Sequence, residues 1–268
     1  MSCMCIEKRT ELLHHKFGIA ASAEQKVIAL AGNPNTGKST VFNALTGLNQ
    51  HTGNWPGKTV GNAQGTFTHK GQSFLLVDLP GTYSLLPNSV DEQVARDFIC
   101  FGQPDVTLVV VDATAMERNL NLALQVMEIT DQVVLCVNLM DEAERKGIEI
   151  NIADLSKKLG IPVVATAARQ KRGLEELQER LLDVACGNIV PDPFMLRYSQ
   201  EIEQAISELE LKLTPLLKGA LKARWVALRL LDGDDTLLQD IERYMTEEPL
   251  QDPSLGREQE VSPSWPQA

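Results

Sequence analysis

Nine consecutive residues near the start of the chain combine glycines, a lysine and hydroxyl groups. They follow an apolar run at residues 27–31 and are Gly32, Asn33, Pro34, Asn35, Thr36, Gly37, Lys38, Ser39 and Thr40. The pattern G-x-x-x-x-G-K-S between a strand and a helix is typical of a loop that binds nucleotide phosphates, because its backbone N–H groups and the helix N-terminus point at phosphate oxygens. We expect Lys38 to bridge the β- and γ-phosphates and the Ser39 hydroxyl to ligate Mg²⁺.

A carboxylate follows a second apolar run, at residues 74–77, and precedes a glycine. The segment is Asp78, Leu79, Pro80 and Gly81. At a strand end, Asp78 can hold Mg²⁺ through water and the Gly81 N–H can contact the γ-phosphate. The pattern D-x-x-G is elsewhere often only a turn. A phosphate loop earlier in the chain favours a sensor of the γ-phosphate.

A third segment, after the apolar run 133–137, can select the base of the nucleotide. It consists of Asn138, Leu139, Met140 and Asp141. The Asp141 carboxylate can accept hydrogen bonds from N1–H and the exocyclic amine of guanine. Adenine offers neither donor there, so the segment predicts a preference for guanine.

The next strand is followed by Thr166, Ala167 and Ala168. GTPases place a backbone N–H against the guanine carbonyl at this point, usually from a serine–alanine pair. Ala167 stands where serine is usual. An ordinary loop between a strand and a helix is therefore the alternative interpretation.

The loop at residues 53–60 lies between the phosphate loop and Asp78, and it carries glycines and a hydroxyl group before the next strand. We expect Thr59 to be a second protein ligand of Mg²⁺, engaged only when the γ-phosphate is present. With Gly57 and Lys58 it would form a switch that orders with GTP and loosens after hydrolysis. In this loop we expect Trp55 to be mobile and partly exposed rather than a core anchor.

The elements that position these residues follow from the hydrophobic pattern. Short apolar runs predict strands at residues 27–31, 74–77, 106–111, 133–137 and 162–165. Helical spacing predicts helices at residues 39–45, 90–101, 116–129, 152–159 and 173–184. This alternation predicts an α/β fold with a doubly wound, mostly parallel sheet. A strand at 59–69 turns at 70–72 into the run 74–77, which predicts one antiparallel edge strand.

The character of the chain changes near Gly187, where a link rich in proline and glycine begins. Helical patterns follow it at residues 202–213, 217–231 and 234–245. We therefore expect four segments: an N-terminal extension outside the fold (1–25), a nucleotide-binding domain (26–187), a small all-α domain (188–246) and an irregular tail (247–268).

The composition limits the classes of partner. The chain has 268 residues, a net charge of −11 and a pI near 4.9, which argues against a general affinity for nucleic acid. No apolar run approaches the roughly 20 residues that span a bilayer, and the N-terminus lacks the apolar core of a signal peptide. We expect a soluble polypeptide.

Five scattered cysteines do not form a disulfide framework and fit a reducing cytosol. Two of them, Cys3 and Cys5, precede His14 and His15. These four residues can form a site for a soft metal such as zinc. The alternative is a frayed helical arm with incidental ligands.

Three longer motifs narrow the classification. They are Gly-Asn-Pro-Asn-x-Gly-Lys-Ser from Gly32, Gly-Asn-Trp-Pro-Gly-x-Thr-Val from Gly53 and Asp-Leu-Pro-Gly-Thr-Tyr-Ser-Leu from Asp78. Together they resemble the bacterial ferrous iron transport protein B, FeoB, and the helical segment after Gly187 resembles the helical domain of that family. The resemblance implies a P-loop GTPase fold followed by a GDI-like helical domain that favours GDP.

The resemblance also implies a cellular setting. It places the chain on the cytoplasmic side of the bacterial inner membrane, joined to or partnered with a membrane permease domain that carries Fe²⁺. GTP and GDP are the expected ligands, Mg²⁺ the cofactor and nucleic acid no partner. A homo-oligomer is left open.

The expected catalytic residues are Asn35, Lys38, Thr59 and Gly81. Thr82 stands where Ras-like enzymes carry a water-orienting glutamine and is too short for that role. Asn35 matches the asparagine that helps hold K⁺ in related potassium-stimulated GTPases, so slow hydrolysis accelerated by K⁺ is expected. Two alternatives are a GTPase acting on RNA or ribosome maturation and a nucleotide-gated interaction module with negligible hydrolysis.

Overall fold

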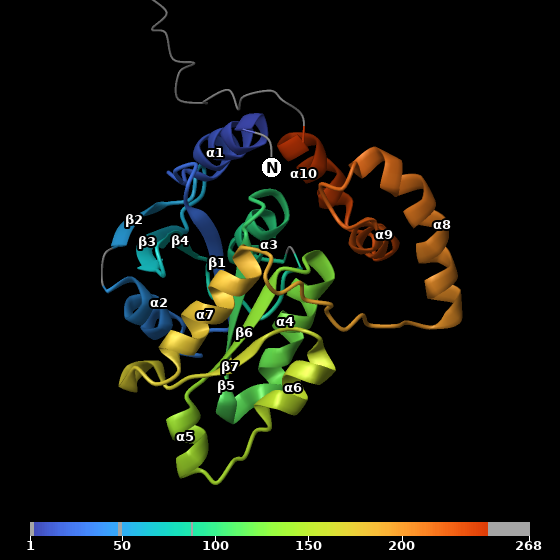
Figure 1. The fold of residues 1–268 in the computed structure, drawn as a ribbon. Coiled ribbons are helices and arrows are strands. Elements are labelled where there is room, and N and C mark those ends of the chain that lie inside the picture. Colours follow the sequence, from blue (N-terminus) through green and yellow to red (C-terminus); the bar gives the residue numbers. More distant parts are fainter. Residues whose placement is uncertain (1–2, 48–49, 87, 246–268) are drawn as a thin grey trace, which may run out of the picture.

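The computed structural model describes residues 3–47, 50–86 and 88–245, and its centre is a seven-stranded sheet in the order β2-β3-β4-β1-β5-β6-β7 (Figure 1). The pairs β1–β4, β1–β5, β5–β6 and β6–β7 are parallel, whereas β3 is antiparallel to both β4 and β2. Among the described strands, β3 alone runs against the others, which confirms the predicted mostly parallel sheet. The strands are β1 (Lys26–Gly32), β2 (Gln50–Asn54), β3 (Gly61–His69), β4 (Gln72–Asp78), β5 (Val106–Asp112), β6 (Val133–Asn138) and β7 (Val163–Ala165).

Helices cover both faces of the sheet because its strands carry apolar side chains on both sides. In β1, Val27 and Ala29 belong to the core cluster that includes α3 and α4, while Ile28 and Leu30 belong to the cluster that includes α2 and α7. The helices here are α2 (Lys38–Thr46), α3 (Val90–Phe101), α4 (Met116–Ile129), α5 (Met140–Arg145), α6 (Ile152–Leu159) and α7 (Leu174–Ala185). The short helix α5 and the edge strand β2 were not predicted from the sequence.

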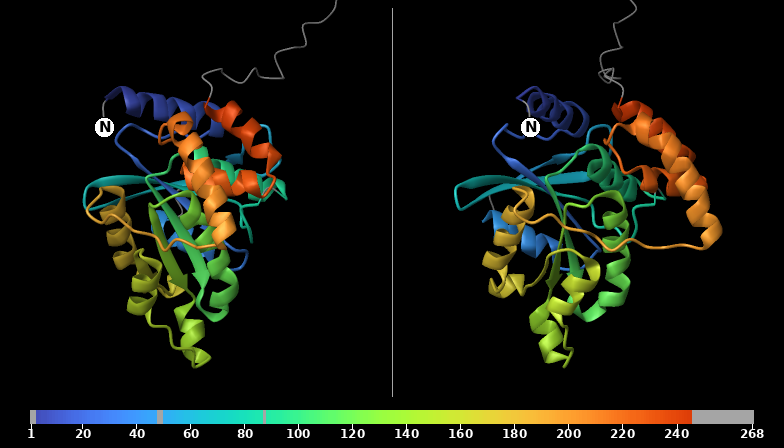
Figure 2. Two further views of the ribbon diagram at one scale, coloured as in Figure 1. Left: turned by 90° about the vertical axis from the view of Figure 1, so that its right-hand side faces the viewer. Right: turned by 45° about the vertical axis from the view of Figure 1, so that its right-hand side comes forward.

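Helices of the C-terminal part form a separate group beside the sheet (Figures 1 and 2). They are α8 (Gln200–Leu217), α9 (Ala223–Leu231) and α10 (Asp235–Met245). Ile206 of α8 is buried against Ala227 and Leu228 of α9. The predicted helix at 217–231 is wrong in its first turn, because Lys218 and Gly219 adopt left-handed backbone conformations and separate α8 from α9. The predicted tail at 247–268 lies outside the described residues.

The N-terminal residues contribute to the core, so the expectation that residues 1–25 lie outside the fold is wrong. Helix α1 (Cys3–Phe17) lies next to α10 in both views of Figure 2. Leu13, Phe17 and Ile19 are buried, and the Phe17 ring stacks on Tyr244 of α10 at 5.4 Å between centroids. Apolar side chains placed along one helix face supply this docking surface.

In the part of the chain that the structure describes, no helix combines the length and the apolar character that crossing a bilayer requires.

Candidate functional site

The phosphate loop connects the end of β1 to the start of α2. Gly37 adopts φ 78°, and a Cβ added there would lie 2.4 Å from the Asn138 side-chain nitrogen. Glycine is therefore required both for its conformation and for the close approach of Asn138. Asn35 is exposed and also left-handed, with φ 68°. Ser39 and Thr40 are exposed in the first turn of α2, where backbone amides lack helical partners.

Lys38 joins the phosphate loop to the end of β4. Its ammonium forms an ion pair with the Asp78 carboxylate and donates a hydrogen bond to the Leu79 carbonyl at 2.8 Å. Burial raises the pKa of Asp78, and the charge of Lys38 opposes this shift. Lys38, expected at the phosphates, and Asp78, expected at Mg²⁺, therefore lie side by side.

The segment after Asp78 runs along β1 and the phosphate loop. The Leu79 N–H donates to the Leu30 carbonyl at 3.0 Å, and the Thr82 N–H donates to the Gly32 carbonyl at 3.3 Å. A Cβ added at Gly81 would lie 3.6 Å from Pro34 Cα. Pro80 and Gly81 are partly exposed, whereas the Thr82 side chain is buried. This arrangement leaves Gly81 directly beside the phosphate loop.

The Asn138 side chain connects three loops at the carboxyl edge of the sheet. Its nitrogen donates to the Thr36 carbonyl at 3.0 Å, which reaches the phosphate loop. Its oxygen accepts hydrogen bonds from the Thr166 hydroxyl at 3.0 Å and the Ala168 N–H at 3.1 Å. Because Asn138 is buried and its amide nitrogen and oxygen both form hydrogen bonds, it holds the phosphate loop against the loop that follows β7.

The residues predicted to contact the base surround Asn138. Leu139 is left-handed, with φ 63°, and α5 starts directly after it, carrying Met140 and Asp141. The Met140 N–H donates to the Thr166 carbonyl at 3.1 Å. Asp141 accepts a hydrogen bond from Gln170 at 3.1 Å. The sequence motifs did not point to Gln170, because it follows the 166–168 segment and no motif includes it.

In the loop that contains Thr59, the burial of Trp55 differs from the expectation. The Trp55 ring is only 3% exposed and contacts Phe98 at 5.4 Å between centroids, so the expected mobile ring is wrong. Thr59 is exposed. Its neighbour Lys58 donates a hydrogen bond to Gln93 of α3 at 3.0 Å. Gly57 adopts φ 69°, which the turn of this loop requires.

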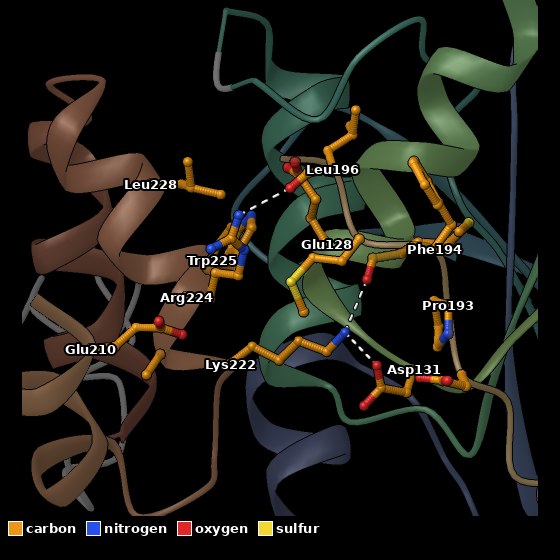
Figure 3. Close-up of a pocket in the computed structure, with 14 residues that line it drawn as sticks. Glu128, Asp131, Pro193, Phe194, Leu196, Glu210, Lys222, Arg224, Trp225 and Leu228 are labelled. Carbon is orange, nitrogen blue, oxygen red and sulfur yellow. Dashed lines mark hydrogen bonds and ion pairs between the residues drawn. The ribbon is translucent and has the colours of Figure 1, made fainter. Parts of the chain in front are cut away.

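A pocket of about 360 Å³ lies away from these loops (Figure 3). It is lined by α4, by α9 and by residues 192–196, which precede α8. Lys222 reaches across it to the Met127 carbonyl at 2.9 Å and to Asp131 at 2.6 Å. Arg224 donates to the Leu196 carbonyl at 3.0 Å. None of the residues predicted from the sequence lines this pocket.

The N-terminal arm gives no metal site among the described residues. The side chains of Cys3 and Cys5 lie outside the description, and His14 and His15 are exposed with their rings edge-on at 5.3 Å. Within the described residues, no group of at least 3 His, Cys, Asp or Glu side chains is arranged to hold a metal ion.

Two parts of the chain match models of domains of the same protein family. The family model of ferrous iron transport protein B matches residues 26–181, and that of the FeoB cytosolic helical domain matches residues 198–259. The chain is 39% identical over 226 residues to an Fe(2+) transport protein A/Fe(2+) transporter FeoB fusion protein of Porphyromonas gingivalis, covering 83% of this chain and 26% of that protein. It spans about a quarter of the length of the curated relatives it matches.

Solved structures extend the similarity to three dimensions. The cytosolic domain of the T. maritima FeoB iron transporter in GDP form I has a TM-score of 0.75 at 38% identity, covering 84% of this chain and 87% of that chain. The same domain in GMPPNP form has a TM-score of 0.73 at 37% identity, covering 84% and 88%. The protein therefore belongs to the FeoB family of ferrous iron transport proteins, and its described part contains the P-loop GTPase domain followed by the cytosolic helical domain.

Proposed function

We propose that this chain binds GTP with Mg²⁺ and hydrolyses it to GDP and phosphate. The observation that carries the proposal is the Asn138 side chain, which joins the phosphate loop at Thr36 to the guanine-side loop at Thr166 and Ala168. One nucleotide can then span both loops, with its phosphates at one and its base at the other. Ligands of parallel α/β sheets bind at this edge.

On the phosphate side, Lys38 and Asp78 already lie together. Lys38 and the amides at the start of α2 neutralise the phosphates, and the Gly81 N–H contacts the γ-phosphate. The hydroxyls of Ser39 and Thr59 would hold Mg²⁺, with Asp78 assisting through water. Bound there, Mg²⁺ supplies positive charge that stabilises the transferring phosphoryl group. In the described structure the Asp78 carboxylate pairs with the Lys38 ammonium, and in the proposed complex it pairs with Mg²⁺ instead.

The base side selects guanine. Asp141 accepts hydrogen bonds from the guanine N1–H and amine, and the backbone of residues 166–168 lies on the side of the guanine carbonyl, with the Ala168 N–H donated to Asn138. Asn138 orients the Ala168 N–H, and Gln170 donates a hydrogen bond to the Asp141 carboxylate. A site that pairs with these donors rejects adenine because its buried polar groups would be left unpaired.

Hydrolysis relies on Asn35 and K⁺ rather than on a glutamine. Thr82, at the position of that glutamine, is buried against the phosphate loop and directs its N–H to Gly32. Asn35 is exposed on the same loop. Its amide oxygen is an available ligand for K⁺, which would stabilise charge developing on the phosphates.

The test compares GTP turnover in K⁺ and in Na⁺. We expect K⁺ to accelerate turnover on the order of tenfold or more, as other preorganised charges do. Asn35→Ala should remove this acceleration, and Asn35→Asp, which keeps a side-chain oxygen, should retain part of it. Equal rates of the original protein in the two salts would contradict the role of K⁺. Absence of any turnover would favour the nucleotide-gated interaction module.

At the level of the cell, we propose that nucleotide state switches the chain's conformation and thereby regulates Fe²⁺ uptake. Support comes from relatives described as Fe(2+) transporters, of which this chain matches about a quarter. The partner is then a membrane permease domain, with this chain on the cytoplasmic side of the bacterial inner membrane. The net charge of −11 disfavours the RNA-directed alternative. Fe²⁺ uptake by cells carrying Lys38→Ala would test this: unchanged uptake contradicts regulation.

A further inference from the structure

A buried aromatic residue anchors the loop that carries Thr59. Asn54, Pro56, Gly57 and Thr59 are exposed, whereas Trp55 between them is buried. The Trp55 carbonyl accepts a hydrogen bond from the Lys58 N–H at 3.0 Å, and the Trp55 N–H donates to the Val60 carbonyl at 2.9 Å. The position of the whole turn is therefore set by what contacts the Trp55 ring.

Helix α1 supplies part of that contact. The Phe17 ring meets Trp55 edge-on at 6.3 Å and Phe98 of α3 at 5.2 Å between centroids. The next residue, Gly18, has φ 66°, and a Cβ added there would lie 3.3 Å from Pro56 Cγ. The end of α1 thus lies directly against the Thr59 loop. The family model begins at residue 26, so this contact comes from outside the matched region.

Lys58 makes a second attachment to the same side of the molecule. Its ammonium donates to Gln93 at 3.0 Å and lies 3.9 Å from the Asp97 carboxylate. Asp97 pairs with the buried Arg96, which also contacts Asp240 of α10. A buried carboxylate cluster of this kind favours a nearby cation, because unpaired buried charge is costly.

We propose that Phe17 and Lys58 are positioning residues for Thr59, holding its loop in the arrangement in which the Thr59 hydroxyl faces solvent. This rests on the proposed role of Thr59 as a Mg²⁺ ligand. Thr59 is exposed and follows Lys58 directly, so a movement of the turn that brings its hydroxyl to the metal would strain these two attachments. Contacts that favour one arrangement of a loop shift the equilibrium toward it. The attachments therefore lower the affinity for GTP relative to GDP.

The test measures the affinities for GMPPNP and for GDP in Mg²⁺, using fluorescent nucleotide competition. Phe17→Leu keeps an apolar side chain but loses the ring contact, and Lys58→Met keeps the stem but loses the charge. Each should raise the ratio of GMPPNP affinity to GDP affinity by roughly twofold to tenfold, the equivalent of one aromatic or ionic contact. Hydrogen exchange at residues 55–60 should become faster in both variants.

Phe67→Ala is the matched control for loss of a buried ring. Phe67 stacks on Phe74 at 4.9 Å in the core cluster on the other face of the sheet. It should lower stability and leave the affinity ratio unchanged. A change in the ratio equal to that of Phe17→Leu would overturn the inference, because it would reflect general loosening.

Thr59→Ala separates this inference from the function on which it rests. It should lower the GMPPNP affinity and leave the GDP affinity nearly unchanged. If it does so while Phe17→Leu and Lys58→Met leave the ratio unaltered, the positioning role is wrong and the role of Thr59 stands. If Thr59→Ala has no effect on either affinity, both are wrong.

Discussion

The Asn138 side chain connects the two parts of the candidate site, the phosphate loop and the base loop. Its three hydrogen bonds reach Thr36, Thr166 and Ala168, and its nitrogen lies close to Gly37. A polar group with every partner inside the protein has no freedom left to follow a displaced ligand. The side chain therefore keeps the phosphate loop and the base loop in fixed relation before any nucleotide arrives, which lowers the ordering cost of binding.

Replacing Asn138 by alanine should test this at the level of one residue. The variant leaves the Thr36 carbonyl, the Thr166 hydroxyl and the Ala168 N–H without their common partner. We expect the free energy of unfolding to fall by about 2–4 kcal/mol, since each unpaired buried group costs about 1–3 kcal/mol and water will pair some of them. Urea denaturation measures the change. Asn188→Ala, at an exposed asparagine, is the control and should shift the midpoint little.

The motifs located most of the candidate site because each lies within a few consecutive residues. The pairing of Lys38 with Asp78 follows from two motifs placed on neighbouring strands. The burial of Trp55 could not be predicted in this way. It depends on Phe17 and Phe98, which are distant in sequence and belong to no motif. Local composition, rich in glycine and proline, indicated the opposite.

At the scale of elements, apolar runs predicted the strands that are buried on both faces. β2 was not predicted because Gln50–Asn54, which pairs with β3, has no apolar side chain. α5 is short and begins after the left-handed Leu139, so its periodicity is too brief to detect. The sequence placed the start of α9 at residue 217 instead of Ala223, because a turn at Lys218 interrupts a continuous apolar pattern.

The contact between α8 and α9 should respond to pH through Glu203. Hydrogen bonds from Arg224 and from the Tyr198 N–H lower the pKa of Glu203 to about 2 from 4.5. The unfolded chain then binds this proton at higher pH than the folded one, so the stabilisation is present above about pH 4.5 and is lost as pH falls toward about 2. Urea midpoints recorded across this window should fall for the original protein.

Glu203→Gln should flatten that part of the pH dependence. Its midpoint should already be lower at neutral pH, because the ion pair with Arg224 is gone. Glu208→Gln, five residues further along α8, is the matched control and should keep the original slope. Identical slopes in the original protein and in Glu203→Gln would show that the pair does not hold α8 in place.

For the whole molecule, a buried ionic cluster joins the GTPase domain to the helical domain. Arg96 of α3 is fully buried and contacts Asp97, Asp234 and Asp240, of which the last lies on α10. The Tyr244 hydroxyl of α10 donates to Asp97 at 3.4 Å. A single guanidinium thus compensates carboxylates from both domains. The cluster makes the two domains one unit and places α10 within reach of Lys58.

Arg96→Met should therefore weaken the contact between the GTPase domain and the helical domain. It removes the guanidinium that pairs with the buried Asp97 and Asp240, and breaking a buried pair in this way costs about 3–5 kcal/mol. We expect the free energy of unfolding, measured in urea, to fall by that amount. The helices α8–α10 should become sensitive to protease before the sheet does. Arg145→Met is the control, because its pair with Glu142 is exposed and such pairs contribute about 0–1 kcal/mol. Adding Asp240→Asn to Arg96→Met should recover part of the loss, since one unpaired charge is removed. An Arg96→Met protein as stable as the control would show that the domains are joined by apolar contacts such as Phe17–Tyr244 alone.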